Sequence, residues 1–117
     1  MKRPPDLATI RALHWARGAL RHVDRTLATK TPADVAVRPP RSGLPPEAVR
    51  GVRYALRRRS ATCLERALVM QAWLAGQGVR VPVVVGVAGG TDRFAAHAWL
   101  EGEKHEPFEE VLRLPPP

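Results

Sequence analysis

Residues 61–101 decide the fold class and read ATCLERALVMQAWLAGQGVRVPVVVGVAGGTDRFAAHAWLE. The first part places apolar side chains at helical spacing until Gly76, which ends the helix. Residues 81–87 are a run of mostly β-branched side chains, typical of a short strand buried on both faces. Residues 89–92 indicate a turn, and residues 94–101 a second strand. The stretch therefore predicts a helix followed by an antiparallel β-hairpin.

Two further helices are predicted before this stretch. Apolar residues recur at three- and four-residue steps over residues 7–27, the stripe of an amphipathic helix. Residues 32–46 are too rich in Pro, Ser and Gly to continue it, and we expect a connector with an extended piece at residues 35–37. Pro45-Pro46-Glu47 is typical of a first helical turn. Residues 108–114 add a third short strand or a helical turn. We expect an α+β domain with N-terminal helices packed on a small antiparallel sheet.

The length and the net charge of the chain limit the classes of function that it can have. The 117 residues fit one domain, since domains usually hold about 100 to 150 residues. The net charge is +8, and residues 1–60 hold 14 Lys/Arg against 4 Asp/Glu, whereas residues 61–117 hold 5 against 7. A basic half of this strength fits a nucleic acid, an anionic membrane or an acidic peptide or protein. It fits a solvated, arginine-rich helix surface equally well.

No targeting or membrane-spanning segment is expected. The first residues carry positive charge but lack the apolar run of about 7 to 15 residues that marks a signal peptide. The sequence also lacks the run of about 18 apolar residues that a spanning helix needs. We therefore expect a soluble, cytoplasmic protein in which the single cysteine, Cys63, stays reduced.

Cys63 is predicted to lie in the first turn of a helix. Thr62-Cys63-Leu64-Glu65 fits the capping box, in which Thr62 caps the helix and Glu65 returns a hydrogen bond to the backbone. Free amide donors and the positive end of the helix dipole favour a thiolate there. The alternative is a buried cysteine that only fills the core, which is common.

His97 follows 34 residues later, on the second predicted strand. Alternation places His97, Trp99 and Glu101 on one face, which we expect to look toward the start of the Cys63 helix. A thiol beside an imidazole is the minimum for nucleophilic catalysis, because histidine holds the proton and later protonates the leaving amine. A histidine on a strand that only hydrogen-bonds locally is the alternative, as is a Trp99 that only packs.

Three segments together carry a resemblance to a family. They are Cys63-Leu64-Glu65-Arg66-Ala67-Leu68, Val84-Val85-Gly86-Val87 and Ala96-His97-Ala98-Trp99-Leu100-Glu101. They resemble the leader peptidases of lasso-peptide biosynthesis over residues 45–114, after a basic N-terminal helix at 1–31 and the Pro-rich connector at 32–46.

The resemblance implies a bacterial, transglutaminase-like or papain-like cysteine protease. Such an enzyme removes the leader from a ribosomally made precursor peptide, with Cys63 as nucleophile and His97 as general base and acid. It also implies partners: the precursor, a leader-recognition protein that presents it in split systems, and a macrolactam synthetase that closes the ring using ATP.

The acid of the triad departs from the family pattern. The family usually supplies an aspartate after the histidine strand, but the last aspartate here is Asp92. We expect Glu106, which precedes Pro107, to orient the imidazole, with Glu109 and Glu101 as competitors. The alternative is that Glu106 is a solvent-exposed carboxylate with no part in catalysis.

No cofactor is expected, because the histidines and the cysteine lack zinc-ligand spacing and there is no glycine-rich phosphate loop. Two other functions remain open at this level. A non-catalytic transglutaminase-like module would use the same fold to bind peptides or partners. A basic nucleic-acid-binding protein is disfavoured by the scarcity of aromatic residues. If the basic helices hold a leader or its recognition protein, charge reversal at residues 57–59 weakens that complex without unfolding the chain.

Overall fold

The computed structural model describes residues 6–41, 43–89, 94–103 and 109–117. Within them lie three α-helices and one three-stranded antiparallel sheet, which confirms the α+β prediction. The helices are α1 (Leu7–Leu27), α2 (Val49–Arg58) and α3 (Cys63–Gly76), and the strands are β1 (Val83–Gly89), β2 (Phe94–Leu100) and β3 (Glu109–Leu114). Short 3-10 turns at Pro32–Asp34 and Pro46–Ala48 lie in the connector and before α2.

The periodicity predicts the extent of α1 and the burial of its later stripe residues, whereas Leu7 and Ile10 at the start of the stripe are exposed. Asp6 caps the helix by accepting a hydrogen bond from the backbone N–H of Thr9 at 2.8 Å. The buried side is lined mainly by small and aliphatic residues, namely Thr9, Ala12, Ala16, Ala19, Leu20 and Val23. Small side chains on this face let α2 approach closely. A Cβ on Gly51 of α2 would lie 2.2 Å from the carbonyl oxygen of Thr9, so only glycine fits at this crossing.

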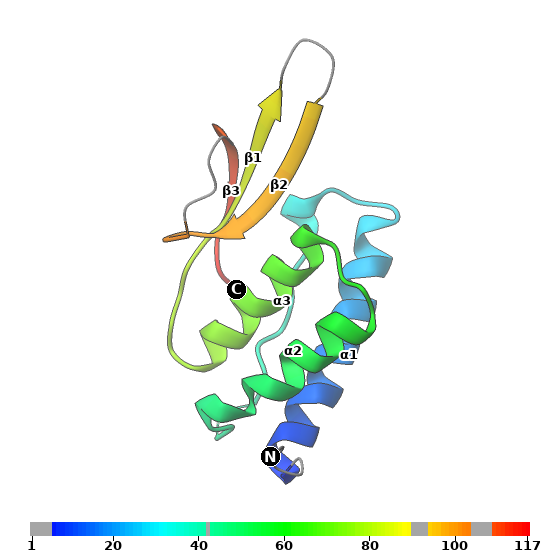
Figure 1. Cartoon of the computed structure of the whole chain (residues 1–117), viewed down its shortest axis with the longest axis vertical. Helices are drawn as coiled ribbons and strands as arrows, with labels where there is room; N and C mark the ends of the chain where they lie inside the picture. The colour runs from blue at the N-terminus through cyan, green and yellow to red at the C-terminus, as the bar shows by residue number, and fades with distance from the viewer. Residues whose placement is uncertain (1–5, 42, 90–93, 104–108) are drawn as a thin grey trace.

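Helix α3 is the centre of the molecule, between the sheet and the pair formed by α1 and α2 (Figure 1). Its Trp73 is one of the largest fully buried side chains, and the ring of Trp15 from α1 lies with its centroid 6.1 Å from that of Trp73. The helix therefore buries side chains on more than one side, which suits its apolar composition.

The sheet has the order β2-β1-β3, with β1 in the middle. Val83 and Val84 are successive residues that point to opposite faces, and they are 0% and 2% exposed. This confirms burial on both faces at the start of the strand, whereas Val85 and Val87 are only partly buried. The third strand pairs antiparallel with β1 rather than with its sequence neighbour β2, and a register shift lies between Val85 and Gly86.

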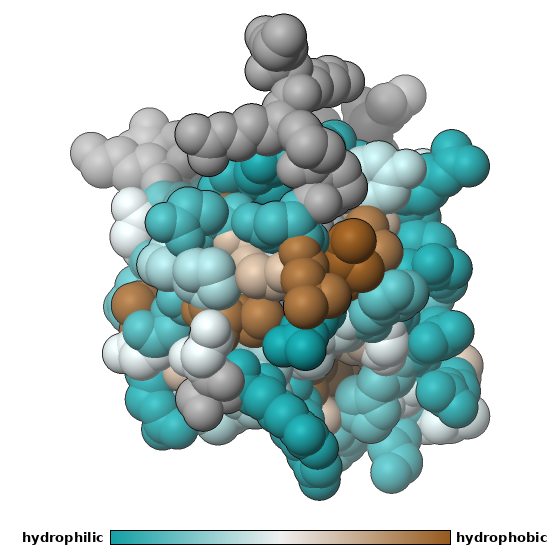
Figure 2. Space-filling view, turned by 90° about the horizontal axis from the view of Figure 1, so that it is seen from below, coloured by the Kyte–Doolittle hydropathy of each residue, from teal (hydrophilic) through white to brown (hydrophobic). Residues whose placement is uncertain are grey.

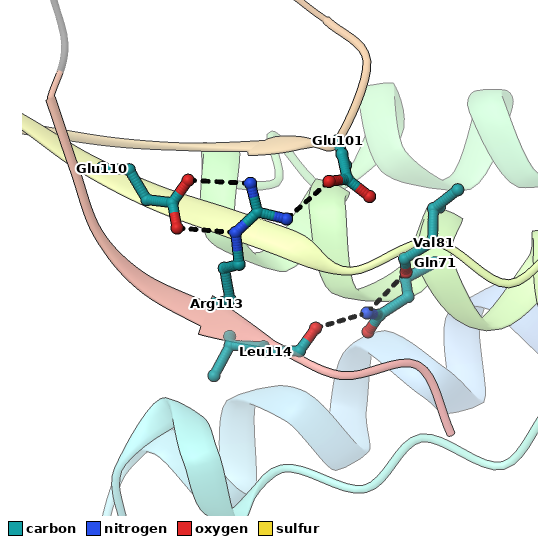
Figure 3. A network of polar contacts seen from close by, with 6 residues as sticks. All are labelled: Gln71, Val81, Glu101, Glu110, Arg113 and Leu114. Atoms are coloured by element: carbon teal, nitrogen blue, oxygen red, sulfur yellow. Dashed lines mark hydrogen bonds and ion pairs between the residues drawn. The ribbon is translucent and has the colours of Figure 1, made fainter.

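Gln71 ties this sheet to α3. Its side-chain amide is buried and donates hydrogen bonds to the carbonyl oxygens of Val81, at 3.0 Å, and Leu114, at 2.9 Å (Figure 3). These carbonyls flank the start of β1 and the end of β3, so one side chain joins three segments of the chain.

The connector is more ordered than its composition predicts. Thr31 and Asp34 form a capping box on the first 3-10 turn. Val35 is extended, as expected, but residues 35–37 join no strand. In the described part of the chain, no helix is both long and apolar enough to cross a membrane.

Candidate functional site

The thiol of Cys63 lies where the capping-box pattern predicts, at the first residue of α3. The backbone N–H of Thr62 donates to the carboxylate of Glu65 at 2.8 Å, and the backbone N–H of Glu65 donates to the Thr62 hydroxyl at 3.2 Å. Both halves of the box are therefore present. Cys63 is half-buried and packs against the edge of the hydrophobic core.

The carboxyl group of Asp24, on α1, lies beside the Glu65 carboxylate of this cap. Asp24 shares a hydrogen bond with Glu65, and this bond, followed by burial and the nearby negative charge, raises the pKa of Asp24 above its ordinary value of 3.8. Partial burial acts to raise the pKa of Glu65, but hydrogen bonds with Asp24 and Thr62 outweigh it and lower that pKa. Arg59 lies close enough to act on both carboxyls. The cap of the cysteine helix therefore lies beside a second carboxyl group from α1, and the two share a hydrogen bond only while one of them is protonated.

His97 lies on β2 and stacks on Trp99, with ring centroids 6.0 Å apart and planes 24° from parallel. Its backbone pairs with Gly86 of β1. The indole of Trp99 covers Gly86, since a Cβ there would lie 2.5 Å from the ring. His97, Trp99 and Gly86 therefore share one face of the sheet.

The opposite face of β2 is the one that meets the helices. Ala98 is 6% exposed and belongs to the hydrophobic core with α3, and Leu100 packs against that core. Our expectation that the face of His97, Trp99 and Glu101 looks toward the start of the Cys63 helix is therefore wrong. The small side chain of Ala98 explains the outcome, because it lets α3 approach β2 closely.

The two elements that carry Cys63 and His97 are nevertheless in contact. Helix α3 packs against β2. The N-terminal end of α3 is the end nearer to β2, and the helix then runs away from the strand (Figure 1). Strand β2 lies at the edge of the described sheet, and His97 lies on its face away from α3. This helix start beside an edge strand is the candidate active site.

Comparison with protein-family models decides the family. The model described as the transglutaminase-like superfamily matches residues 7–112, nearly the whole chain. The chain belongs to the transglutaminase-like superfamily. The match begins at the first residue of α1, so the N-terminal helix is part of this transglutaminase-like domain. Searches of curated proteins and of solved structures found no match.

The three candidate acids of this transglutaminase-like domain differ in position. Glu106 lies outside the described residues. Glu101 accepts a hydrogen bond from Arg113 at 2.5 Å, and Glu110 accepts two from the same guanidinium at 2.6 and 2.9 Å (Figure 3). Hydrogen bonds to Glu110 and then Glu101 raise the pKa of Arg113. Glu109 is exposed at the start of β3. Glu101 is thus held by an arginine across the sheet.

Within the described residues, no group of three or more His, Cys, Asp or Glu side chains is arranged to hold a metal ion. A pocket of about 200 Å³ lies between the connector and the C-terminal prolines, and neither Cys63 nor His97 lines it. Sequence reasoning missed Asp24 as a neighbour of the site, and it named Gly86 only within a segment of the family resemblance without giving it a role. The only local signal for Gly86 was a glycine inside a strand, which often marks a close approach of another group.

Proposed function

We propose that this transglutaminase-like domain is a cysteine peptidase, a hydrolase that removes the leader peptide from a lasso-peptide precursor. The observation that carries the proposal is Cys63, a half-buried thiol at the capped N-terminus of α3 in a chain of this superfamily. The segments that resemble lasso-peptide leader peptidases supply the substrate class. A helix N-terminus stabilises a thiolate through its dipole and its free backbone N–H groups.

The proposed reaction has two steps. The sulfur of Cys63, after its proton passes to His97, attacks the carbonyl carbon at the end of the leader, and the carbonyl oxygen takes up the electron pair. The backbone N–H of Cys63 is a donor available to that oxyanion. Collapse of the intermediate breaks the C–N bond, and the imidazolium of His97 protonates the departing amine of the core peptide. Water, deprotonated by His97, then hydrolyses the thioester and restores the thiol.

This reaction requires His97 to meet Cys63 at the edge of β2. Catalytic hydrogen bonds are often long in enzymes without substrate and shorten in the complex. In the proposal, the imidazole leaves its stack on Trp99 when the precursor binds, and Glu106 fixes its orientation as the third member of the triad. The leader-recognition protein presents the precursor, and a macrolactam synthetase uses the product.

A non-catalytic, peptide-binding module is the second candidate. The stack of His97 on Trp99, on the face away from α3, favours it. In this reading the fold keeps a peptide surface without a working Cys-His pair.

Cleavage of the precursor separates the two candidates. The purified protein is mixed with the precursor and the recognition protein from the same gene neighbourhood, and the products are measured by mass spectrometry. The peptidase predicts a single cut between leader and core, lost in Cys63→Ala and kept in His14→Ala, which changes an exposed histidine of α1. Cleavage by Cys63→Ala at the wild-type rate contradicts the peptidase. Binding of the precursor without any cut by the wild type supports the module instead.

A further inference from the structure

The exposed face of α2 consists of arginines and one tyrosine. The helix buries Gly51, Val52, Ala55 and Leu56. All its other residues from position 50 onward are exposed, and they are Arg50, Arg53, Tyr54, Arg57 and Arg58. Tyr54 is 51% exposed, and Arg50, Arg57 and Arg58 stand three or four residues from it. The face therefore surrounds one aromatic ring with positive charge.

The arginines on this exposed face are not explained by a contribution to the stability of α2. Within the described residues, no acidic side chain lies at ion-pair distance from Arg53, Arg57 or Arg58. Arg53 and Arg57 are four residues apart, a spacing at which like charges weaken a helix. The helix dipole favours Arg57 and Arg58 near the C-terminus but not Arg53. A partner that supplies negative charge would relieve the repulsion.

Helix α1 continues the same surface. A Cβ on Gly51 would lie 2.9 Å from the backbone nitrogen of Leu13, so α1 and α2 meet at these residues. Ile10 and Arg17 are three residues before and four after Leu13, so they lie along the same seam, and both are exposed. Tyr54 is one helical turn beyond Gly51. Ile10 is 40% exposed. Seen from below, the surface of the molecule shows hydrophobic side chains among hydrophilic ones (Figure 2).

We propose that this surface docks an acidic, amphipathic segment of a partner polypeptide. The surface, called the Tyr54 surface below, comprises Ile10, Arg17, Arg53, Tyr54, Arg57 and Arg58. Guanidinium groups pair bidentately with carboxylates, and tyrosine and arginine are the side chains that most often carry the binding energy of protein interfaces. Tyr54 and Ile10 supply the apolar anchors.

Other anionic partners fit less well. A nucleic acid backbone pairs with the arginines but makes no use of Ile10. A membrane surface requires a broad apolar helix face, and the Tyr54 surface offers only Ile10 and Tyr54 among its arginines. The proposal does not depend on the proposed peptidase activity, and it sharpens the role of residues 57–59, because Arg59 belongs instead with Asp24 and Glu65.

Fluorescence anisotropy with the full chain tests the proposal. The probe is a labelled synthetic peptide of about 20 residues with Leu and Glu at helical spacing, compared with the same peptide carrying Gln for Glu. We expect the Glu peptide to bind, and R53E/R57E/R58E to weaken its binding about tenfold or more. Tyr54→Ala weakens it several-fold, whereas Tyr54→Phe, which keeps the ring, retains most of it.

A matched variant separates the surface from net charge. R38E/R41E/R80E makes the same change of charge at exposed positions outside the Tyr54 surface, and it is expected to bind the Glu peptide within about twofold of wild type. Circular dichroism establishes that each variant is folded. Equal weakening by the two triple variants overturns the proposal, as does equal binding of the Gln peptide. Tighter binding of a single-stranded oligonucleotide or of phosphatidylserine vesicles at the same ionic strength overturns it as well.

Discussion

The indole of Trp99 covers the backbone of Gly86 on the neighbouring strand, where a Cβ would approach the ring to 2.5 Å. The same Cβ would lie 2.9 Å from the carbonyl oxygen of Glu109 on the other side. Both contacts involve groups with little freedom to move, since one is a packed ring and the other is the backbone of β3. The absence of a side chain at Gly86 therefore leaves the space in which the Trp99 ring lies and His97 stacks on it.

Gly86→Ala should displace Trp99 and lower the free energy of unfolding by about 1 to 3 kcal/mol, the usual cost of overpacking. The stack with His97 should be lost with it, which NMR of the imidazole protons measures. Gly18→Ala is the control, because a Cβ there meets nothing within 4 Å, and alanine favours a helix interior over glycine. Equal stability of Gly86→Ala and wild type would contradict the described packing.

Gln71→Leu should destabilise the fold although the position is buried. The substitution leaves the carbonyls of Val81 and Leu114 without their donor, and an unpaired buried polar group costs about 1 to 3 kcal/mol. Urea unfolding measures the change. Gln77→Leu is the matched control, since within the described residues its amide donates one hydrogen bond, to the carbonyl of Leu44 in a partly buried site, and it should cost less. A smaller loss for Gln71→Leu than for Gln77→Leu would refute the role of Gln71.

The Asp24 and Glu65 pair predicts a pH dependence of stability. The lowered pKa of Glu65 gives a contribution that is present above its ordinary value of 4.5 and lost as pH falls through the folded value. The raised pKa of Asp24 gives a contribution present below 3.8 and lost as pH rises through the folded value. The shared hydrogen bond is therefore lost toward neutral pH.

Asp24→Asn should keep a donor to Glu65 at every pH. We expect this variant to gain stability relative to wild type as pH rises from about 4 to 7, measured as Tm in a single buffer series. This gain in stability is partly offset, because asparagine carries no charge and loses the attraction of Asp24 to Arg59. In a Glu65→Gln background the same substitution should show no such rise with pH. A rise of equal size in that background would mean that the pair is not its source.

Glu106→Gln should lower the turnover number for leader removal about 100-fold or more while leaving precursor affinity nearly unchanged, because an orienting carboxylate acts on the imidazole rather than on the substrate. Glu109→Gln is the matched control and should stay within about threefold of wild type. Glu101→Gln should mainly weaken the contact with Arg113. A larger loss for Glu101→Gln or Glu109→Gln than for Glu106→Gln would reassign the acid.

Local pattern predicted most of the elements. The helix from Leu7 to Leu27, the capping box at Thr62 and Glu65, and the hairpin of β1 and β2 each depend on neighbours in sequence, and the structure confirms them. The pairing of β3 with β1 was not predicted, because strand order depends on contacts across the whole domain.

The position of His97 relative to Cys63 was also not predicted from the local sequence pattern. Alternation places His97 and Trp99 on one face correctly, but it does not tell which face the helices cover. That choice follows from the packing of Ala98 and Leu100 against the core. The partnership of Asp24 with Glu65 joins two helices far apart in sequence, and no spacing rule signals it.

The rate of leader removal by single and double variants of Cys63 and His97 tests the central claim most directly. Residues that act as one catalytic unit lose activity together, so Cys63→Ala, His97→Ala and the double variant should all fall to the same residual rate, about 1000-fold or more below wild type. Single-turnover cleavage of the precursor, followed by mass spectrometry, gives these rates. A wild-type rate for Cys63→Ala, or losses in the two single variants that multiply in the double variant, would contradict a Cys63–His97 peptidase.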